Sequence, residues 1–298
     1  MIVNELYNGQ GFGNQLANYV TTRVFCKDKG YDFGIKSPEK FKGHSFMELD
    51  FGLSVIGGTG PEGGPPHTLP EGITHYFKEK ITRHPNGSDV TIDDPELENV
   101  KDNTKIDGNF QSENRIWHRK DEIKEWLKIK PEFDFKGYSF DDICVINFRG
   151  FGVGPPADGF FLHQKYWQDA VQRMRDINPN FRFVVITEDV QTAKQFFPDF
   201  TVRHYDIGTD FCIVKNAKYL ILSNSSFPYY ATLISDTIKY IIAPKYWGRY
   251  NMSDGYWSCG YNIFRNHNYI DRENKLFTYD ECVAEFDEYK NKYKHIWT

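Results

Sequence analysis

Between residues 143 and 243, short apolar runs alternate with amphipathic helical patterns. The apolar runs cover residues 143–146, 183–186, 219–222 and 240–243. Runs of four residues with no polar face are typical of strands that are buried on both sides in a parallel sheet. The segments between them, such as the one carrying Tyr166, Trp167 and Ala170, repeat apolar residues at helical spacing. This alternation predicts an α/β fold of Rossmann type, a parallel sheet with helices on both faces.

The first 130 residues have a less regular pattern. A short strand at residues 2–3 precedes a glycine-rich loop, and a helix is expected from residue 14 to residue 29, closed by Gly30. Residues 57–72 are so rich in Gly and Pro that we expect an exposed loop there. A length of 298 residues favours two domains, which we place at residues 1–135 and 136–298.

Composition excludes several classes of protein. The formal net charge is -5, so the chain has no basic excess with which to bind nucleic acid by counterion release. Five widely spaced cysteines without a CxxC pair, and histidines without metal-like clustering, argue against a disulfide framework and a metal site. No signal peptide and no long apolar run are visible, so we expect a cytoplasmic protein without a membrane span.

Polar residues follow the predicted strands, where a parallel sheet binds its ligands. After the first strand come Asn147 and Arg149; the guanidinium of Arg149 suits a phosphate, although a surface ion pair explains it equally well. Thr187, Glu188 and Asp189 follow the second strand and could bind a nucleoside or cap the next helix. Residues after the third strand could bind an anion or act as a cap. These last residues are Asn224, Ser225 and Ser226.

A tight polar loop also follows the first strand of the chain. It contains Gly11, Gly13, Asn14 and Gln15. Asn14 stands where a dinucleotide fingerprint needs its third glycine, so this is not a Rossmann fingerprint, but the loop could contact a ligand. No two aspartates are separated by one residue, so the metal-binding DxD signature of many sugar-nucleotide enzymes is absent from the sequence.

Several segments together resemble glycosyltransferase family 11, the α-1,2-fucosyltransferases. Residues 11–16 are similar to the family's GxGNQ-type loop, residues 106–113 to its GYFQSE segment, and residues 183–189 to its FSDD strand end. Residues 210–233 resemble its block ending in NSTFSWW, and residues 243–247 its closing APxxW. The order and spacing of these segments extend over residues 1–250.

The resemblance implies a GT-B-like enzyme of two Rossmann-type halves. Residues 136–298 would bind GDP-fucose without a metal, and residues 1–135 would lie on the acceptor side. By the same resemblance Arg149 would neutralise the leaving diphosphate, Ser225 and Ser226 would hold phosphates, and Glu188 or Asp189 the nucleoside.

The chain departs from the family after the first strand of its second half. Asn147 replaces a histidine, and residues 150–154 replace a segment that carries a carboxylate. Either another acid takes over, for which Asp158 is our candidate for the general base, or the donor or acceptor differs, or activity is weak. Asp158 could equally be a turn residue before Gly159.

The function predicted from the sequence is therefore an inverting, metal-independent transfer of L-fucose from GDP-fucose to a hydroxyl of a glycan, in α-1,2 linkage by resemblance. Two alternatives remain open. One is a catalytically silent carbohydrate-binding relative, and the other is the same scaffold with another nucleotide sugar.

Overall fold

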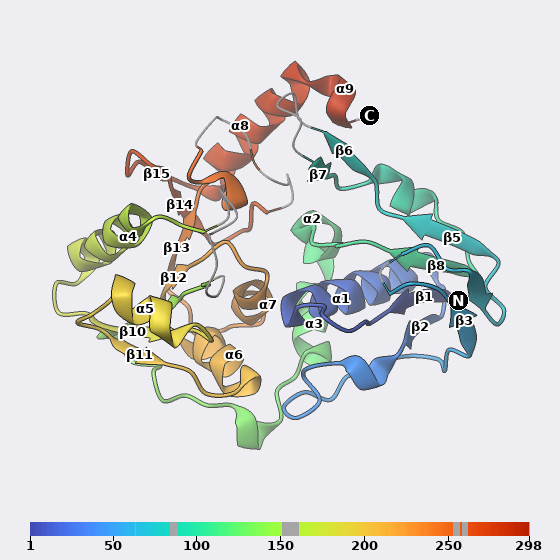
Figure 1. The fold of residues 1–298 in the computed structure, drawn as a ribbon, viewed down its shortest axis with the longest axis horizontal. Coiled ribbons are helices and arrows are strands. Elements are labelled where there is room, and N and C mark those ends of the chain that lie inside the picture. The colour runs from blue at the N-terminus through green and yellow to red at the C-terminus, as the bar shows by residue number, and fades with distance from the viewer. Residues whose placement is uncertain (63, 84–88, 151–160, 253–256, 258–261, 298) are drawn as a thin grey trace. The chain divides into compact units, whose positions relative to one another are not determined.

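In a computed structural model, the chain divides into two units (Figure 1). Unit 1 is Met1–Ile129 and unit 2 is Lys130–Ile296. The structure describes residues 1–62, 64–83, 89–150, 161–252, 257 and 262–297. Among these residues, no helix combines the length and the apolar character needed to cross a membrane.

Unit 2 contains a seven-stranded sheet in the order β11-β10-β9-β12-β13-β14-β15. Its strands are β9 (Ile143–Asn147), β10 (Arg182–Ile186), β11 (Thr201–Arg203), β12 (Tyr219–Leu222), β13 (Tyr240–Pro244), β14 (Asn268–Ile270) and β15 (Leu276–Phe277). All neighbours pair in parallel except β15, which is antiparallel to β14. The four apolar runs of the sequence are β9, β10, β12 and β13, as predicted.

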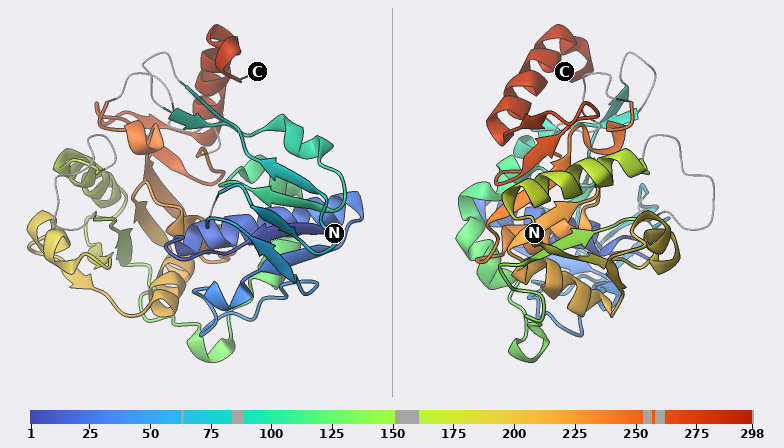
Figure 2. Two further views of the ribbon diagram at one scale, coloured as in Figure 1. Left: turned by 45° about the vertical axis from the view of Figure 1, so that its right-hand side comes forward. Right: turned by 90° about the vertical axis from the view of Figure 1, so that its left-hand side faces the viewer.

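Helices cover both faces of this sheet, which confirms the predicted fold class (Figures 1 and 2). They are α4 (Gln164–Ile177), α5 (Val190–Phe196), α6 (Ile207–Asn216), α7 (Phe227–Leu233) and α8 (Tyr279–Lys292), and the short α9 (Lys294–Trp297) follows α8. Tyr166 and Trp167 of α4 are buried in one cluster with Cys144 of β9. The next residue, Val145, faces the other side of the sheet and is also buried, and α6 contacts β9 there.

Unit 1 has its own parallel sheet, in the order β2-β1-β8-β5. The strands are β1 (Ile2–Glu5), β2 (Phe33–Lys36), β5 (His75–Lys78) and β8 (Thr104–Asp107). The helices are α1 (Phe12–Lys29), α2 (Glu113–Ile116) and α3 (Lys120–Trp126). Gly30 ends α1 with φ 70°, as the sequence predicts, because glycine adopts the left-handed conformation without strain.

The expected loop at residues 57–72 is instead a short antiparallel hairpin of β3 (Gly57–Thr59) and β4 (Thr68–Pro70). Gly57 and Gly58 lie within β3 and have positive φ, a backbone conformation that glycine adopts without strain. A second small pair joins β6 (Ile81–Arg83) to β7 (Asp89–Thr91). Short 3-10 turns complete the fold: Pro38–Lys40, Pro95–Asn99, Trp117–Arg119, Pro131–Phe133 and Trp247–Arg249.

Candidate functional site

The order of the strands in unit 2 reverses at one place in the sheet. From β9 the chain adds β10 and β11 on one side, and it then returns to add β12, β13 and β14 on the other. The crevice at such a reversal, beyond the carboxyl ends of the strands, is where open α/β sheets bind ligands. Here it lies between β9 and β12, where the backbone N–H of Ser223 donates to the carbonyl of Asn147 over 3.1 Å.

Buried polar side chains line this carboxyl edge. Asn147, Thr187 and Ser223 end or follow three adjacent strands, and all three are almost fully buried, as is Asn224. Ser223 is only 1% exposed, and its hydroxyl has no hydrogen-bond partner among the described residues. Because a buried polar group without a partner costs free energy, such a group calls for an explanation, and a bound ligand is one.

Arg149 extends from the end of β9 toward the end of β10. Its Nη1 lies 2.6 Å from Oε1 of Glu188, and the two side chains are 46% and 63% exposed. The predicted arginine therefore lies at the predicted edge, where a ligand in solution can reach it. It also makes the ion pair that the sequence left open as the alternative.

Asp189 is held in place by three neighbours. Its Oδ1 accepts a hydrogen bond from the backbone N–H of Thr192 over 3.2 Å and so caps α5. Its own N–H donates to the hydroxyl of Thr187 over 3.0 Å. A Cβ on Gly150 would lie 2.0 Å from Asp189 Oδ2 and 2.6 Å from its Cβ, so a glycine is required where the end of β9 packs on Asp189.

The serines after β12 are organised by the start of α7. The hydroxyl of Ser225 accepts from the backbone N–H of Phe227 over 3.3 Å, which is the capping role considered above. Ser226 occupies the N-cap position without a side-chain capping bond. Asp158, the candidate base, lies outside the described residues.

The predicted loop of Gly11, Gly13, Asn14 and Gln15 belongs to unit 1. Gln15 is fully buried; its amide donates to the carbonyl of Lys40 and accepts from the N–H of Lys42, both over 2.9 Å. Both ends of this side chain therefore serve the fold. Asn14 Oδ1 accepts from Gln111 Nε2 over 2.8 Å, which joins two of the segments that carry the family resemblance.

A carboxylate that the sequence did not single out follows β5 in unit 1. Oε2 of Glu79 accepts from the backbone N–H groups of Asn109 and Phe110 over 2.7 and 3.3 Å. Burial raises the pKa of Glu79 to about 7, although both amides favour its charged form. Only the tertiary structure reveals this residue, because its partners lie about 30 positions further along the chain.

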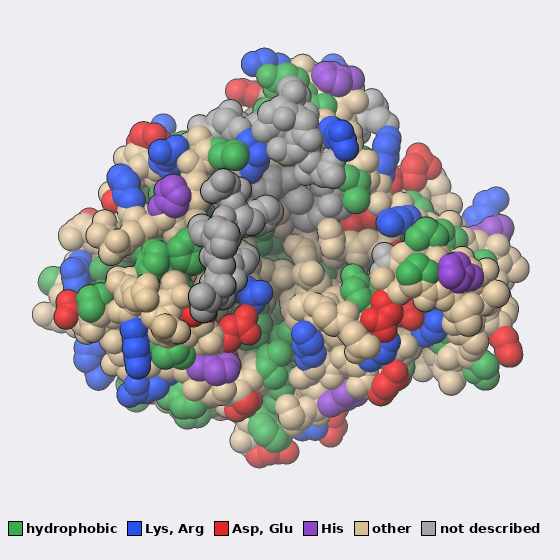
Figure 3. Space-filling view, in the orientation of Figure 1, with side chains coloured by type: hydrophobic (Ala, Val, Ile, Leu, Met, Phe, Trp, Pro, Cys, Tyr) green, Lys and Arg blue, Asp and Glu red, His purple; other side chains and the backbone are tan. Residues whose placement is uncertain are grey.

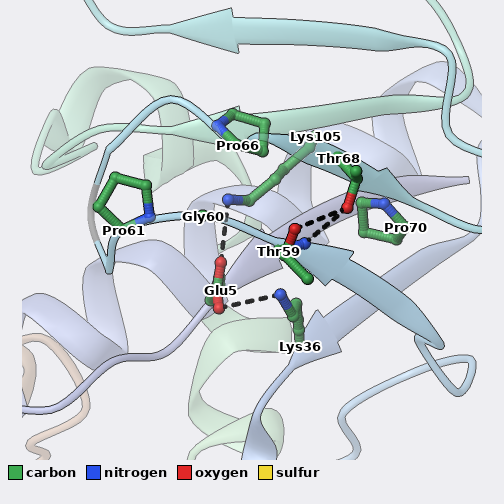
Figure 4. Close-up of a pocket in the computed structure, with 9 residues that line it drawn as sticks. All are labelled: Glu5, Lys36, Thr59, Gly60, Pro61, Pro66, Thr68, Pro70 and Lys105. Atoms are coloured by element: carbon green, nitrogen blue, oxygen red, sulfur yellow. Dashed lines mark hydrogen bonds and ion pairs between the residues drawn. The ribbon is translucent and has the colours of Figure 1, made fainter.

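Unit 1 also contains a polar pocket at the carboxyl ends of β1 and β2 (Figure 4). Glu5 forms ion pairs with Lys36 over 3.3 Å and with Lys105 over 2.9 Å. The hairpin of β3 and β4 closes the pocket with Thr59 and Thr68.

A hydrogen-bonded pair of His204 and Asp210 in unit 2 was also not predicted from the sequence. His204 follows β11, and its Nδ1 lies 2.8 Å from Oδ2 of the buried Asp210. The other oxygen of Asp210 accepts from the N–H of Tyr205. Burial raises the pKa of Asp210, and the bond to His204 opposes that shift.

Charge is mixed on the surface drawn in Figure 3, where Lys and Arg are interspersed with Asp and Glu. Among the described residues, no group of three or more His, Cys, Asp or Glu side chains is arranged to hold a metal ion. The described cysteines Cys26, Cys144, Cys212 and Cys282 are buried and free.

No protein-family model matches the sequence, and a search of the curated proteins finds no match. Among solved structures, the chain is similar to the glycosyl transferase family 9 protein of Veillonella parvula, with 11% identity and a TM-score of 0.47 over 100% of this chain and 90% of that one.

Two further structures are similar to the chain. NodZ α-1,6-fucosyltransferase soaked with GDP-fucose is 13% identical, with a TM-score of 0.45 over 93% of this chain and 97% of that one. POFUT1 in complex with GDP is 10% identical, with a TM-score of 0.43 over 81% and 97%.

Proposed function

We propose that the chain is a glycosyltransferase that transfers L-fucose from GDP-fucose to a hydroxyl of a glycan, with inversion and without a metal ion. Unit 2 binds the donor and unit 1 serves the acceptor. The resemblance of five sequence segments to the α-1,2-fucosyltransferases supports the donor and the linkage.

The position of Arg149 carries this proposal. It is an accessible guanidinium two residues after β9, at the carboxyl edge where the buried side chains of Asn147 and Ser223 also lie, at the ends of β9 and β12. A guanidinium binds two phosphate oxygens at once, and the neighbouring polar groups can donate to others. Together these groups fit a diphosphate.

The chemistry follows from that placement. The bond between the anomeric carbon and the β-phosphate oxygen breaks, and the acceptor oxygen forms the new bond from the opposite side. Negative charge grows on the departing phosphate, so a fixed arginine stabilises the transition state more than the ground state. The acceptor hydroxyl loses its proton to a base, for which Asp158 is our candidate.

A second candidate function rests on Asn147. This residue occupies the place of the family's histidine and is buried, and a side-chain amide does not titrate to exchange a proton at neutral pH. The replacement of the family's histidine by Asn147 is consistent with a protein that binds a nucleotide sugar or a glycan without turning it over.

One experiment separates the two functions. The purified protein is incubated with GDP-fucose and a glycan panel in excess EDTA, and released GDP and fucosylated product are quantified by mass spectrometry. We expect both products. GDP-fucose binding without GDP release would support the silent relative, and activity restored only by manganese or magnesium would contradict metal independence. Turnover of another nucleotide sugar alone would reassign the donor.

A further inference from the structure

The two acidic residues at the end of β10 differ in their freedom to move. Asp189 accepts a hydrogen bond from the backbone N–H of Thr192 and so caps α5, and its side chain packs against Gly150. A change of its side-chain conformation would break the capping bond. Glu188 is 63% exposed and is held to Arg149 by a bond to one carboxylate oxygen. Of the two, Glu188 is therefore the one that can respond to a ligand.

The ion pair opposes the binding of a phosphate. A carboxylate and a phosphate compete for the same guanidinium donors, and a carboxylate left beside a bound phosphate would repel it. A ligand that needs Arg149 must therefore displace Glu188 from it. Because both side chains are exposed to solvent, the ion pair is weak enough for a ligand to break.

Only some ligands can offer Glu188 new hydrogen bonds in place of its lost ion pair with Arg149. A carboxylate accepts hydrogen bonds from hydroxyl groups, and a ribose offers two adjacent ones. A nucleoside diphosphate thus gives each residue a new partner: its phosphate binds Arg149, and its ribose hydroxyls donate to Glu188. Inorganic pyrophosphate replaces it on one side only.

We propose that Glu188 is a specificity-determining residue, an internal counter-ion of Arg149 that disfavours phosphates without a sugar and favours nucleoside diphosphates. This inference rests on the proposed function, because it assumes a nucleoside diphosphate at this edge. It also assigns separate tasks to Glu188 and Asp189, which the sequence alone could not distinguish.

The test is calorimetric titration of the full-length protein with GDP and, separately, with inorganic pyrophosphate, in buffer with EDTA. The variant is Glu188→Gln, which keeps the size of the side chain and removes its charge. The matched control is Asp199→Asn, which removes one exposed charge just before β11. Asp199 lies at the amino-terminal ends of the strands, away from the carboxyl edge that carries Glu188.

We expect Glu188→Gln to bind pyrophosphate about threefold to fivefold more tightly, because an exposed ion pair no longer competes. We expect it to bind GDP about tenfold more weakly, because charged hydrogen bonds to the ribose are lost. The gain for pyrophosphate should shrink at high salt and disappear in Arg149→Met. Asp199→Asn should change neither affinity by more than about twofold.

Affinities that move in the same direction for both ligands, or that do not move, would overturn the inference while leaving the proposed function intact. A wild-type protein that binds pyrophosphate but not GDP would overturn the proposed function and, with it, the selectivity assigned to Glu188. Binding of neither ligand by wild type and variant alike would overturn both.

Discussion

The two units both have parallel sheets, but they place their charges differently. In unit 2 the strands β9, β10, β12 and β13 are apolar along most of their length, and the buried polar side chains gather at their carboxyl ends. In unit 1 a charged side chain lies inside the sheet. Lys105 of β8 has a side chain 4% exposed, between Glu5 at 2.9 Å and Asp107 at 3.3 Å.

This difference shows two ways of building a similar sheet. Unit 2 relies on burying apolar surface, and it keeps its polar groups where a ligand can meet them. Unit 1 depends on ion pairs between strands that are about 100 residues apart in the chain. Charge inside the sheet should therefore matter for stability in unit 1, and charge at the carboxyl edge of the sheet should matter for activity in unit 2. Three predictions test that contrast.

The largest effect is expected in unit 1, for Lys105→Met. Removing one partner of a buried ion pair leaves Glu5 and Asp107 with one cation fewer, and such a loss costs about 3–5 kcal/mol. Chemical denaturation of the purified variant measures the free energy of unfolding.

The matched control in unit 2 is Lys218→Met. Lys218 pairs with the exposed Asp141, which keeps Lys239 as a second partner, so the expected loss is below about 1 kcal/mol. Equal losses for the two variants would contradict the contrast between the units.

The second effect concerns turnover in unit 2, for Arg149→Lys. The charge is kept but the planar guanidinium is lost, so turnover of a confirmed donor should fall roughly a hundredfold, with little change in stability. Arg149→Ala should be more severe.

Arg182→Lys is the control for that variant. Arg182 also forms an exposed ion pair, with Asp142, but it stands at the first residue of β10, at the amino-terminal edge of the sheet. Its replacement should leave turnover within about twofold. Normal turnover in Arg149→Lys would make Arg149 a structural residue.

The third effect is a pH dependence of stability in unit 1, for Glu79→Gln. The pKa of Glu79 is raised by burial from 4.5 to about 7, so the folded state holds the proton more tightly than the unfolded state. Its stabilising contribution is complete below pH 4.5 and is lost as the pH rises to about 7. The Gln variant mimics the protonated form at every pH.

The difference between the two proteins should therefore be near zero below pH 4.5 and grow to about 3 kcal/mol in favour of the variant above pH 7. Denaturation curves at several pH values measure it. A difference that stays constant with pH would show that Glu79 keeps an ordinary pKa.

The contrast between the units also explains what could be predicted. Four strands of unit 2, β9, β10, β12 and β13, were predicted because each contains a continuous apolar run. The strands β11, β14 and β15 were missed because each has only two or three residues, and only Val202 of β11 is buried. In unit 1 the sequences of β5 and β8 are HYFK and TKID, and lysines inside strands hide the apolar pattern.

The sequence by itself determined the local elements and the polar ends of the strands, since hydrophobic period, glycine and capping residues act between near neighbours. That is why α1 ends at Gly30 and why Arg149 lies at a strand end. Only the tertiary structure decided which charges meet. The pairs of Lys105 with Glu5 and of Arg149 with Glu188 join strands that are distant in the chain, and such pairing depends on the order of strands in each sheet, which no local pattern records.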